Sequence, residues 1–237
     1  MASGSALTLA KRNLRMAVKK TLSTISPESL AIQSQLCVDT LLSLPEYQSS
    51  RQVSVFLSMP AKEIDTSRIV EDGLESGKRL YVPYIYRQPP TQPALSDPAS
   101  ASSPPGLMDM LSLHSLADYR SFKPDKWGIP TIPNGSISTR HNCLECEESV
   151  PDLIVMPGVA FDEGFKRLGH GKGYYDYFLA RCEGVSDRDG VKRKGRMPIL
   201  VALALKEQLF EDGTVPVDVS DWPMDVIISG DGRLLRR

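Results

Sequence analysis

Residues 152–176 read DLIVMPGVAFDEGFKRLGHGKGYYD and contain three successive structural signals. The apolar run within residues 152–156 predicts a short strand, which Pro157 and Gly158 end. A glycine-rich loop follows, and a helix is predicted directly after it. Short, entirely apolar strands that alternate with helices are buried on both faces. This stretch therefore predicts a mostly parallel sheet that is covered by helices on each side.

The same alternation continues on both sides of this stretch. Further strands are predicted over residues 52–57, 80–83, 199–205 and 226–229. A helix start at residues 26–28, with a proline in the first turn, predicts a helix to about Leu44. Thr66 predicts the cap of another helix that ends near Gly77. The order of elements is that of an α/β protein without internal repeats.

Composition excludes several classes of protein. The 237 residues (26.1 kDa) are enough for one large domain or two small ones, without a metal or disulfide to stabilise the core. The net charge of -1 and the pI near 6.3 give no footprint for general nucleic-acid binding. No apolar run approaches the ~18 residues of a membrane helix. Four cysteines are too few for a disulfide scaffold. We therefore expect a cytoplasmic globular protein with neither a membrane nor a nucleic-acid partner.

The amino-terminal segment has two interpretations. It carries five basic residues within its first 27 positions and no acid before Glu28, which is also typical of a mitochondrial transit peptide. However, Leu14, Val18 and Leu22 form an i, i+4, i+8 apolar stripe that could pack on a domain. We favour a structural helix that stays in the mature protein, and a mitochondrial location remains the alternative.

Two segments have the composition of inserted loops. Residues 88–106 contain six prolines among small polar residues, which cannot form a core. Residues 184–196 contain five basic residues and three glycines. That basic set could suggest an RNA-binding patch or an address signal, but a solvated surface loop is the simpler interpretation.

The glycine-rich loop carries the chemistry. Gly169, Gly171 and Gly173 let a backbone approach a ligand closely, and the amides at the start of the following helix would point toward an anion. Arg167 and Lys172 add mobile cations of the kind that hold polyphosphate. These residue types predict a phosphate site.

The loop matches neither of the common nucleotide-binding motifs. Lys166 stands where a Walker A loop has its first glycine, and Tyr174 occupies the last glycine position of a dinucleotide fingerprint. A plain glycine turn before a helix, with Asp176 complementing the helix dipole, is the alternative to a phosphate site.

The sequences MPGVAFD at 156–162 and RLGHGKGYYD at 167–176 closely resemble the 5-formyltetrahydrofolate cyclo-ligase (methenyltetrahydrofolate synthetase) family. The resemblance extends in order through Lys11 and Arg15, residues 56–59 with 63–64, 108–110, 126–130, 202–208 and 221–225. It covers nearly the whole chain, while 133–150 match little.

This resemblance implies a three-layer α/β/α fold with a mostly parallel, Rossmann-like sheet, similar to sugar-phosphate isomerases and CoA-transferases. It implies one domain over residues 1–237, acting as a monomer. The implied reaction converts 5-formyltetrahydrofolate, with or without a polyglutamate tail, to 5,10-methenyltetrahydrofolate. The reaction consumes ATP and requires Mg²⁺. The formyl oxygen attacks the γ-phosphoryl group, N10 then closes the ring, and ADP and phosphate are released.

The resemblance also implies roles for individual residues. The implied catalytic residues are Lys172, Arg167 and Tyr174. ATP would be bound by Lys11, Arg15, Arg167, Leu168, Gly169, His170, Gly171, Lys172, Gly173, Tyr174 and Tyr175. The folate would contact Met59, Glu63, Met110, Trp127 and Tyr174. Asp176 and Asp225 would hold Mg²⁺, and Asp221 is the alternative to Asp225.

Several of these residues have a structural alternative. Asp225 could be a turn residue before a strand, and Trp127 could be a packing anchor. Met59 and Met110 are methionines, which more often belong to a core than to a ligand site. One of the two tyrosines after the loop could face the folate while the other fills the core.

Two further interpretations remain open on sequence grounds. Cys143 and Cys146, with His141 nearby, could suggest zinc, but a structural site needs four ligands, so we expect free thiols in a loop. A non-catalytic folate- or phosphate-binding protein could share the fold. Such a protein would be expected to lose Lys172 or Asp176, and both are present, which favours the enzyme.

Overall fold

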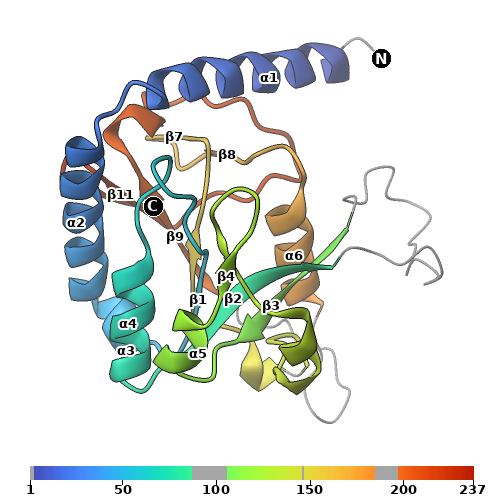
Figure 1. Cartoon of the computed structure of the whole chain (residues 1–237). Coiled ribbons are helices and arrows are strands. Elements are labelled where there is room, and N and C mark those ends of the chain that lie inside the picture. Colours follow the sequence, from blue (N-terminus) through green and yellow to red (C-terminus); the bar gives the residue numbers. More distant parts are fainter. Residues whose placement is uncertain (1–2, 87–105, 146, 185–196) are drawn as a thin grey trace.

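A seven-stranded sheet forms the centre of the molecule in the computed structural model, which describes residues 3–86, 106–145, 147–184 and 197–237 (Figure 1). The strand order is β12-β11-β9-β6-β1-β2-β3. The five inner strands pair in parallel, and each edge strand is antiparallel. The strands are β1 (Gln52–Val55), β2 (Arg79–Tyr86), β3 (Leu107–Ser112), β6 (Leu153–Met156), β9 (Ile199–Ala204), β11 (Val226–Ser229) and β12 (Leu234–Arg236).

Helices cover both faces of this sheet. In β6, Leu153 and Val155 point into a core shared with α2 (Pro27–Ser43) and α4 (Ser67–Glu75). Ile154 and Met156 alternate with them and point into a second core, where Phe178 and Leu179 of α6 (Tyr174–Glu183) are fully buried. All four β6 residues are therefore buried, which is why the strand is entirely apolar. The predicted three-layer α/β/α architecture is confirmed.

A small three-stranded sheet lies beside the main one. Its order is β10-β7-β8, formed by Leu209–Phe210, Ala160–Asp162 and Arg167–Leu168. The first helix, α1 (Ser3–Leu22), crosses above this small sheet (Figure 1). Val18 is buried against Val159, Ala160 and Leu168, and Leu14 and Leu22 pack beside it. The apolar stripe of α1 thus packs on the body of the protein, as predicted for a structural helix.

The remaining elements are short. They are α3 (Pro45–Ser49), α5 (Leu116–Arg120), β4 (Lys123–Pro124), β5 (Pro130–Thr131) and the 3₁₀ turns η1 (Asn134–Thr139), η2 (Glu147–Ser149) and η3 (Lys206–Gln208). Within the described ranges, none of the helices has the length and apolar character needed to cross a membrane.

The predicted elements agree with the structure except in detail. The sequence predicted the five inner strands but not β3 and β12, which pair antiparallel at the edges. Thr66 occupies the N-cap position of α4, but its hydroxyl donates to the Phe56 carbonyl instead of capping the helix. The proposed inserted loops lie outside the described residues, except for Gly106 and Gly184 at their ends.

Candidate active site

The glycine-rich loop lies between β8 and α6, at the edge where the parallel strands end. Gly171 and Gly173 both adopt left-handed backbone conformations, with φ of 85° and 69°. L-residues with a side chain rarely adopt this conformation, so both glycines are required by the turn. Gly173 is the N-cap of α6 and has no side chain to cap it. The first amides of α6 therefore have no side-chain acceptor from the N-cap and are free to face an anion.

The first helix reaches this loop through Arg15. Its Nε donates a hydrogen bond to the Gly169 carbonyl at 2.8 Å. A Cβ added at Gly171 would lie 3.1 Å from Arg15 Cζ, so the guanidinium also lies directly beside the second glycine. Burial lowers the pKa of Arg15, and the nearby Asp221 carboxylate opposes that effect. The structure thus places a cation of α1 over the loop, 154 residues away in sequence.

One turn earlier in α1, Lys11 holds two carboxylates. Its Nζ lies 2.6 Å from Asp221 and 2.9 Å from Asp218. Burial alone would lower the pKa of Lys11, but the hydrogen bonds to Asp221 and Asp218 raise it above its ordinary value. Hydrogen bonds from Ser220 and then from Lys11 lower the pKa of Asp218 to about 2. An acidic segment over residues 218–221 therefore faces the middle of α1, one turn before the arginine that covers the loop.

Arg167 is not a mobile cation, which corrects the sequence interpretation. Its side chain is only 4% exposed, and it donates to Asp176 at 2.7 Å. A second nitrogen donates to the Pro157 carbonyl at 3.4 Å, while Nε is buried without a hydrogen-bond partner among the described residues. The guanidinium lies below the loop and ties β8 to the first turn of α6.

Tyr175 lies next to this ion pair. The Arg167 guanidinium is 5.9 Å from the centre of the Tyr175 ring. The hydroxyl is buried without a partner in the described part of the chain, and burial raises its pKa. Tyr174, one residue earlier, is partly buried against the α6 core. Neither tyrosine lies openly at the surface, and Tyr175 is the more deeply enclosed of the two.

A second loop, which follows β1, meets the glycine loop. Glu63 accepts a hydrogen bond from the Met59 amide at 2.7 Å, and its other oxygen lies 3.5 Å from His170 Nε2. The hairpin of β4 and β5 lies beside this loop, because a Cβ at Gly128 would be 3.2 Å from Pro60. The two loops predicted to serve different substrates are thus joined by the contact between Glu63 and His170.

Trp127 occupies the turn between β4 and β5. Its side chain is 55% exposed, and Lys126 Nζ lies 5.3 Å from the ring centre. The turn itself is held by Asp125, which accepts the Trp127 amide at 2.7 Å. A large aromatic ring on a fixed turn with an open face is a suitable stacking platform for a flat ligand ring.

Lys172 and Leu168 occupy opposite environments. Lys172 is exposed at the tip of the loop, and no carboxylate of the described residues lies within ion-pair distance of it. Leu168 is buried under α1, and its carbonyl accepts the Val159 amide at 2.7 Å. Leu168 can therefore contribute only backbone to a ligand site, whereas the Lys172 ammonium is free to meet an anion.

Two predicted site residues lie elsewhere. Met110 is fully buried in the core under α6, which corrects its prediction as a substrate contact. Asp225 stands at the start of β11, where its carboxylate accepts the Leu200 amide at 2.9 Å. The loop lies at the opposite edge of the sheet, and a four-residue strand alone spans roughly 10 Å. The structure therefore does not bring Asp225 to the loop, and Asp221 takes the place beside Lys11.

The carboxylates near the loop fit a magnesium–nucleotide site. Among the described residues, no group of three or more His, Cys, Asp or Glu side chains could hold a metal alone. Mg²⁺ bound with a nucleotide needs only one or two carboxylates, because phosphate oxygens and water complete its shell. Asp176 uses one oxygen for Arg167, and Asp221 uses one for Lys11 and the Asp218 amide. Each retains an oxygen of the kind that Mg²⁺ prefers.

Comparison with known proteins agrees with this arrangement. A sequence model of the 5-formyltetrahydrofolate cyclo-ligase family matches residues 8–230. The chain belongs to this family. It is 32% identical over 222 residues to 5-formyltetrahydrofolate cyclo-ligase of Mus musculus, with 94% of each chain covered. It is 31% identical to the mitochondrial cyclo-ligase of Arabidopsis thaliana, covering 94% of this chain and 74% of the relative.

A solved structure of similar fold is that of 5,10-methenyltetrahydrofolate synthetase from Aquifex aeolicus. Its TM-score is 0.65 at 26% identity, with 95% of this chain and 92% of that chain covered. The matched family region contains most of α1, the glycine loop and the 218–221 segment together. The cyclo-ligase resemblance inferred from the sequence is confirmed.

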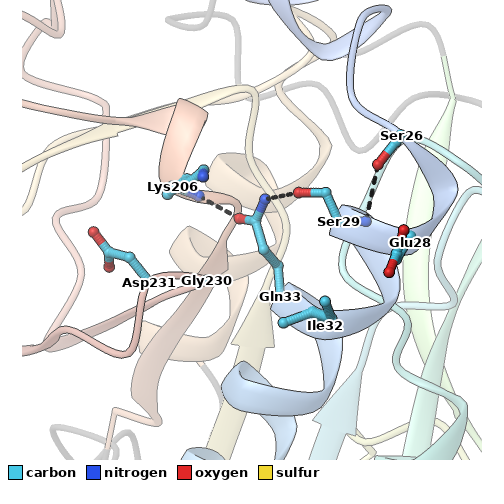
Figure 2. A pocket seen from close by; sticks show the side chains of 8 residues that line it. All are labelled: Ser26, Glu28, Ser29, Ile32, Gln33, Lys206, Gly230 and Asp231. Atoms are coloured by element: carbon cyan, nitrogen blue, oxygen red, sulfur yellow. Dashed lines mark hydrogen bonds between the residues drawn. The ribbon is translucent and has the colours of Figure 1, made fainter.

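The pocket shown in Figure 2 is separate from this cyclo-ligase site. It has a volume of about 360 Å³ and lies between α2 and the segments that follow β9 and β11. Gln33 lies at its wall, and the Gln33 amide is fully used by the Lys206 amide, Ser29 and Glu207. No residue of the glycine-rich loop lines this pocket.

Sequence reasoning missed the residues that hold the cyclo-ligase site together. Asp162 is completely buried although it is charged, and Gln208 donates from a buried position to the Gly158 and Val159 carbonyls. Both residues fall within the stretches that resemble the family, but nothing local marks them as buried. Asp218 was missed because its partner Lys11 is 207 residues away.

Proposed function

We propose that this chain is an ATP-dependent 5-formyltetrahydrofolate cyclo-ligase and that residues 1–237 form one domain. The supporting observation is the meeting of three distant segments at the glycine loop. Arg15 of α1 binds the Gly169 carbonyl, and His170 of the loop lies against Glu63, which follows β1. A plain glycine turn before a helix would not need a cation from α1 and a carboxylate from another loop.

ATP is proposed to lie with its phosphates on the glycine loop. The free amides at the start of α6, the exposed Lys172 ammonium and the Arg15 guanidinium all carry positive charge toward this region. His170 is 58% exposed and can also donate to phosphate. Leu168 would contribute its backbone and Tyr175 the floor of the site, since both side chains are enclosed.

Mg²⁺ is proposed to be held by Asp176 and Asp221 together with phosphate oxygens. When bound, it would neutralise phosphate charge, which is its usual contribution to phosphoryl transfer. Lys11 would keep Asp221 beside the middle of α1 through the ion pair seen at 2.6 Å. Arg167 would fix Asp176 from below through its buried guanidinium.

The reduced folate is proposed to lie between Trp127 and Glu63. Trp127 offers an open aromatic face, and Glu63 presents carboxylate oxygens that accept hydrogen bonds, as the amino groups of a pterin require. Met59 is partly exposed beside Glu63 and can supply an apolar contact. Because Glu63 also touches His170, this placement brings the folate up to the phosphate loop.

The reaction proposed has two steps. The formyl oxygen of 5-formyltetrahydrofolate attacks the γ-phosphorus, so that an O–P bond forms and the bond to ADP breaks. N10 then attacks the activated carbon, loses its proton, and the C–O bond breaks to release phosphate and 5,10-methenyltetrahydrofolate. Catalysis of this kind depends on positioning and charge neutralisation. Lys172, at the exposed tip, is the proposed cation for the transferred group, with Arg167 and Tyr174 supporting it at the start of α6.

The decisive test mixes the purified protein with 5-formyltetrahydrofolate, ATP and Mg²⁺ and follows the absorbance band of methenyl-folate. We expect the band to appear with release of ADP and phosphate in equal amounts, and to require both ATP and Mg²⁺. Tight folate binding without any ATP-dependent product would support the alternative, a non-catalytic folate-binding protein. We also propose that the protein acts as a monomer in the cytoplasm, which size-exclusion chromatography and cell fractionation would test.

A further inference from the structure

The β7–β8 hairpin contains a buried charge that the proposed chemistry does not use. Asp162, at the end of β7, is 0% exposed. Its Oδ1 accepts the Lys166 amide at 3.0 Å, and its Oδ2 accepts the Val215 amide at 3.1 Å. Lys166 Nζ is 3.9 Å away, at the limit of an ion pair. Since an isolated buried carboxylate is costly, its two amide partners are what keep it in this place.

The two amides belong to the two halves of the proposed site. Lys166 directly precedes β8, and β8 leads through Arg167 and Leu168 into the glycine loop. Val215 begins the segment that carries Asp218 and Asp221 to Lys11. One side chain therefore binds the residue that leads into β8 with one oxygen and a residue that leads into the acidic segment with the other.

A second contact fixes the far end of the same segment. The Met224 amide donates to the Phe165 carbonyl at 2.8 Å, and Phe165 adopts a left-handed conformation with φ of 64° within the hairpin turn. The segment over residues 215–224, which contains the acidic segment, is therefore attached to one hairpin at both of its ends. Between these two attachments, Asp221 is free to project toward α1.

We infer that Asp162 is a positioning residue that sets the acidic segment, and with it Asp221, relative to the glycine loop. This inference rests on the proposed function, since it assigns Asp221 and the loop to one magnesium–nucleotide site. Asp162 touches neither of the proposed substrates directly. Its effect should therefore appear in the dependence of the reaction on Mg²⁺ and ATP, and not in its dependence on folate.

The test is Asp162→Asn in the full-length protein. Asparagine keeps the volume but turns one acceptor into a donor, which cannot pair with an amide N–H. We expect the Mg²⁺ concentration for half-maximal rate and the KM for ATP to rise about tenfold each, as for the loss of one charge-assisted hydrogen bond. The KM for 5-formyltetrahydrofolate should stay within about twofold of wild type.

Asp118→Asn is the matched control. Asp118 also uses both carboxylate oxygens, Oδ1 for Arg140 Nη2 at 2.7 Å and Oδ2 for Arg140 Nη1 and the His114 amide at 2.7 and 3.0 Å, but it lies in α5, away from the glycine loop. This variant should lower the melting temperature and leave the Mg²⁺ requirement unchanged. If both variants change all kinetic constants alike, Asp162 has only a structural role and the inference is wrong.

Two further measurements keep the test decisive. The rise in melting temperature caused by Mg²⁺ with ATP is measured in wild type and variant. A smaller rise in the variant would report the positioning effect without any need for turnover. Wild type that forms no methenyl-folate would contradict only the proposed activity. Asp162→Ser, which keeps a single small acceptor, replaces the asparagine variant if that one does not fold. Failure of both variants to fold would make Asp162 a folding determinant and overturn the inference.

Discussion

Aspartates lie at both ends of the parallel strands of the central sheet, and their hydrogen-bonding partners differ between the two ends. At the edge where the parallel strands begin, Asp152 and Asp225 accept backbone amides. At the edge where those strands end, Asp176 and Asp221 pair with the side chains of Arg167 and Lys11. A backbone amide has no other use once the strand is formed, whereas a side-chain cation can exchange its partner for phosphate. The same residue type therefore organises the fold at one edge and is available for ligands at the other.

Removal of the Lys172 ammonium, at the carboxyl end of the parallel strands, should have the largest effect on turnover. Lys172→Met keeps the length of the side chain but removes its charge. Because the ammonium is proposed to act on charge that moves in the transition state, kcat should fall ~100- to 1000-fold. ATP binding, measured by calorimetry, should persist. A variant with nearly normal kcat and weaker ATP binding would make Lys172 an anchor and assign the catalytic cation to Arg15 or Arg167.

The contrast between the aspartates at the two ends of the strands is tested directly with Asp221→Asn and Asp225→Asn. Asp221→Asn should raise the Mg²⁺ requirement for turnover about tenfold, because one proposed carboxylate ligand is lost. Asp225→Asn should leave the Mg²⁺ titration unaltered and lower the free energy of unfolding by about 1 kcal/mol, since the Leu200 amide loses a charged acceptor. Mg²⁺ titrations and urea unfolding on both variants measure the two effects. The reverse result would return the metal role to Asp225.

Two glycines with similar backbone geometry sharpen the same contrast. Gly171 has φ of 85°, and a Cβ there would lie 3.1 Å from Arg15, whereas Gly77 has φ of 76° and nothing within 4 Å of an added Cβ. Both alanine variants should lose about 1 kcal/mol of stability from the left-handed conformation. Only Gly171→Ala should also weaken ATP binding, seen as a severalfold higher KM in steady-state kinetics. Equal ATP affinity in the two variants would show that the loop does not approach a ligand closely.

The smallest effect on function is expected at an ion pair away from both edges. Arg140, with only 1% of its side chain exposed, donates twice to Asp118, and these hydrogen bonds lower the Asp118 pKa. A carboxyl group with a lowered folded-state pKa contributes stability above its unfolded pKa of about 3.9, and this contribution is lost as the pH falls through the folded value. The unfolding free energy of wild type should therefore approach that of Asp118→Asn only in acid, while turnover near neutral pH stays unchanged.

Much of the fold and part of the site could be predicted because their signals are local. The apolar runs of the inner strands, the helix start at Pro27 and the stripe of α1 depend on residues a few positions apart, and each was predicted from the sequence. The glycine loop was recognised for the same reason, since its left-handed turns need glycine within five residues. The edge strands β3 and β12 were missed because their pairing is set by distant neighbours.

The sequence by itself therefore determined the order of elements, the family and the loop on which the chemistry is proposed. Only the tertiary structure separated the surroundings of Asp221 and Asp225, because the two are four residues apart and their partners, Lys11 and Leu200, lie on different elements. It also placed Met110 in the core, paired Arg167 with Asp176 and revealed Asp162. A side chain's partner is fixed by how distant segments pack, and in this protein the bond from Lys11 to Asp221 spans 210 residues.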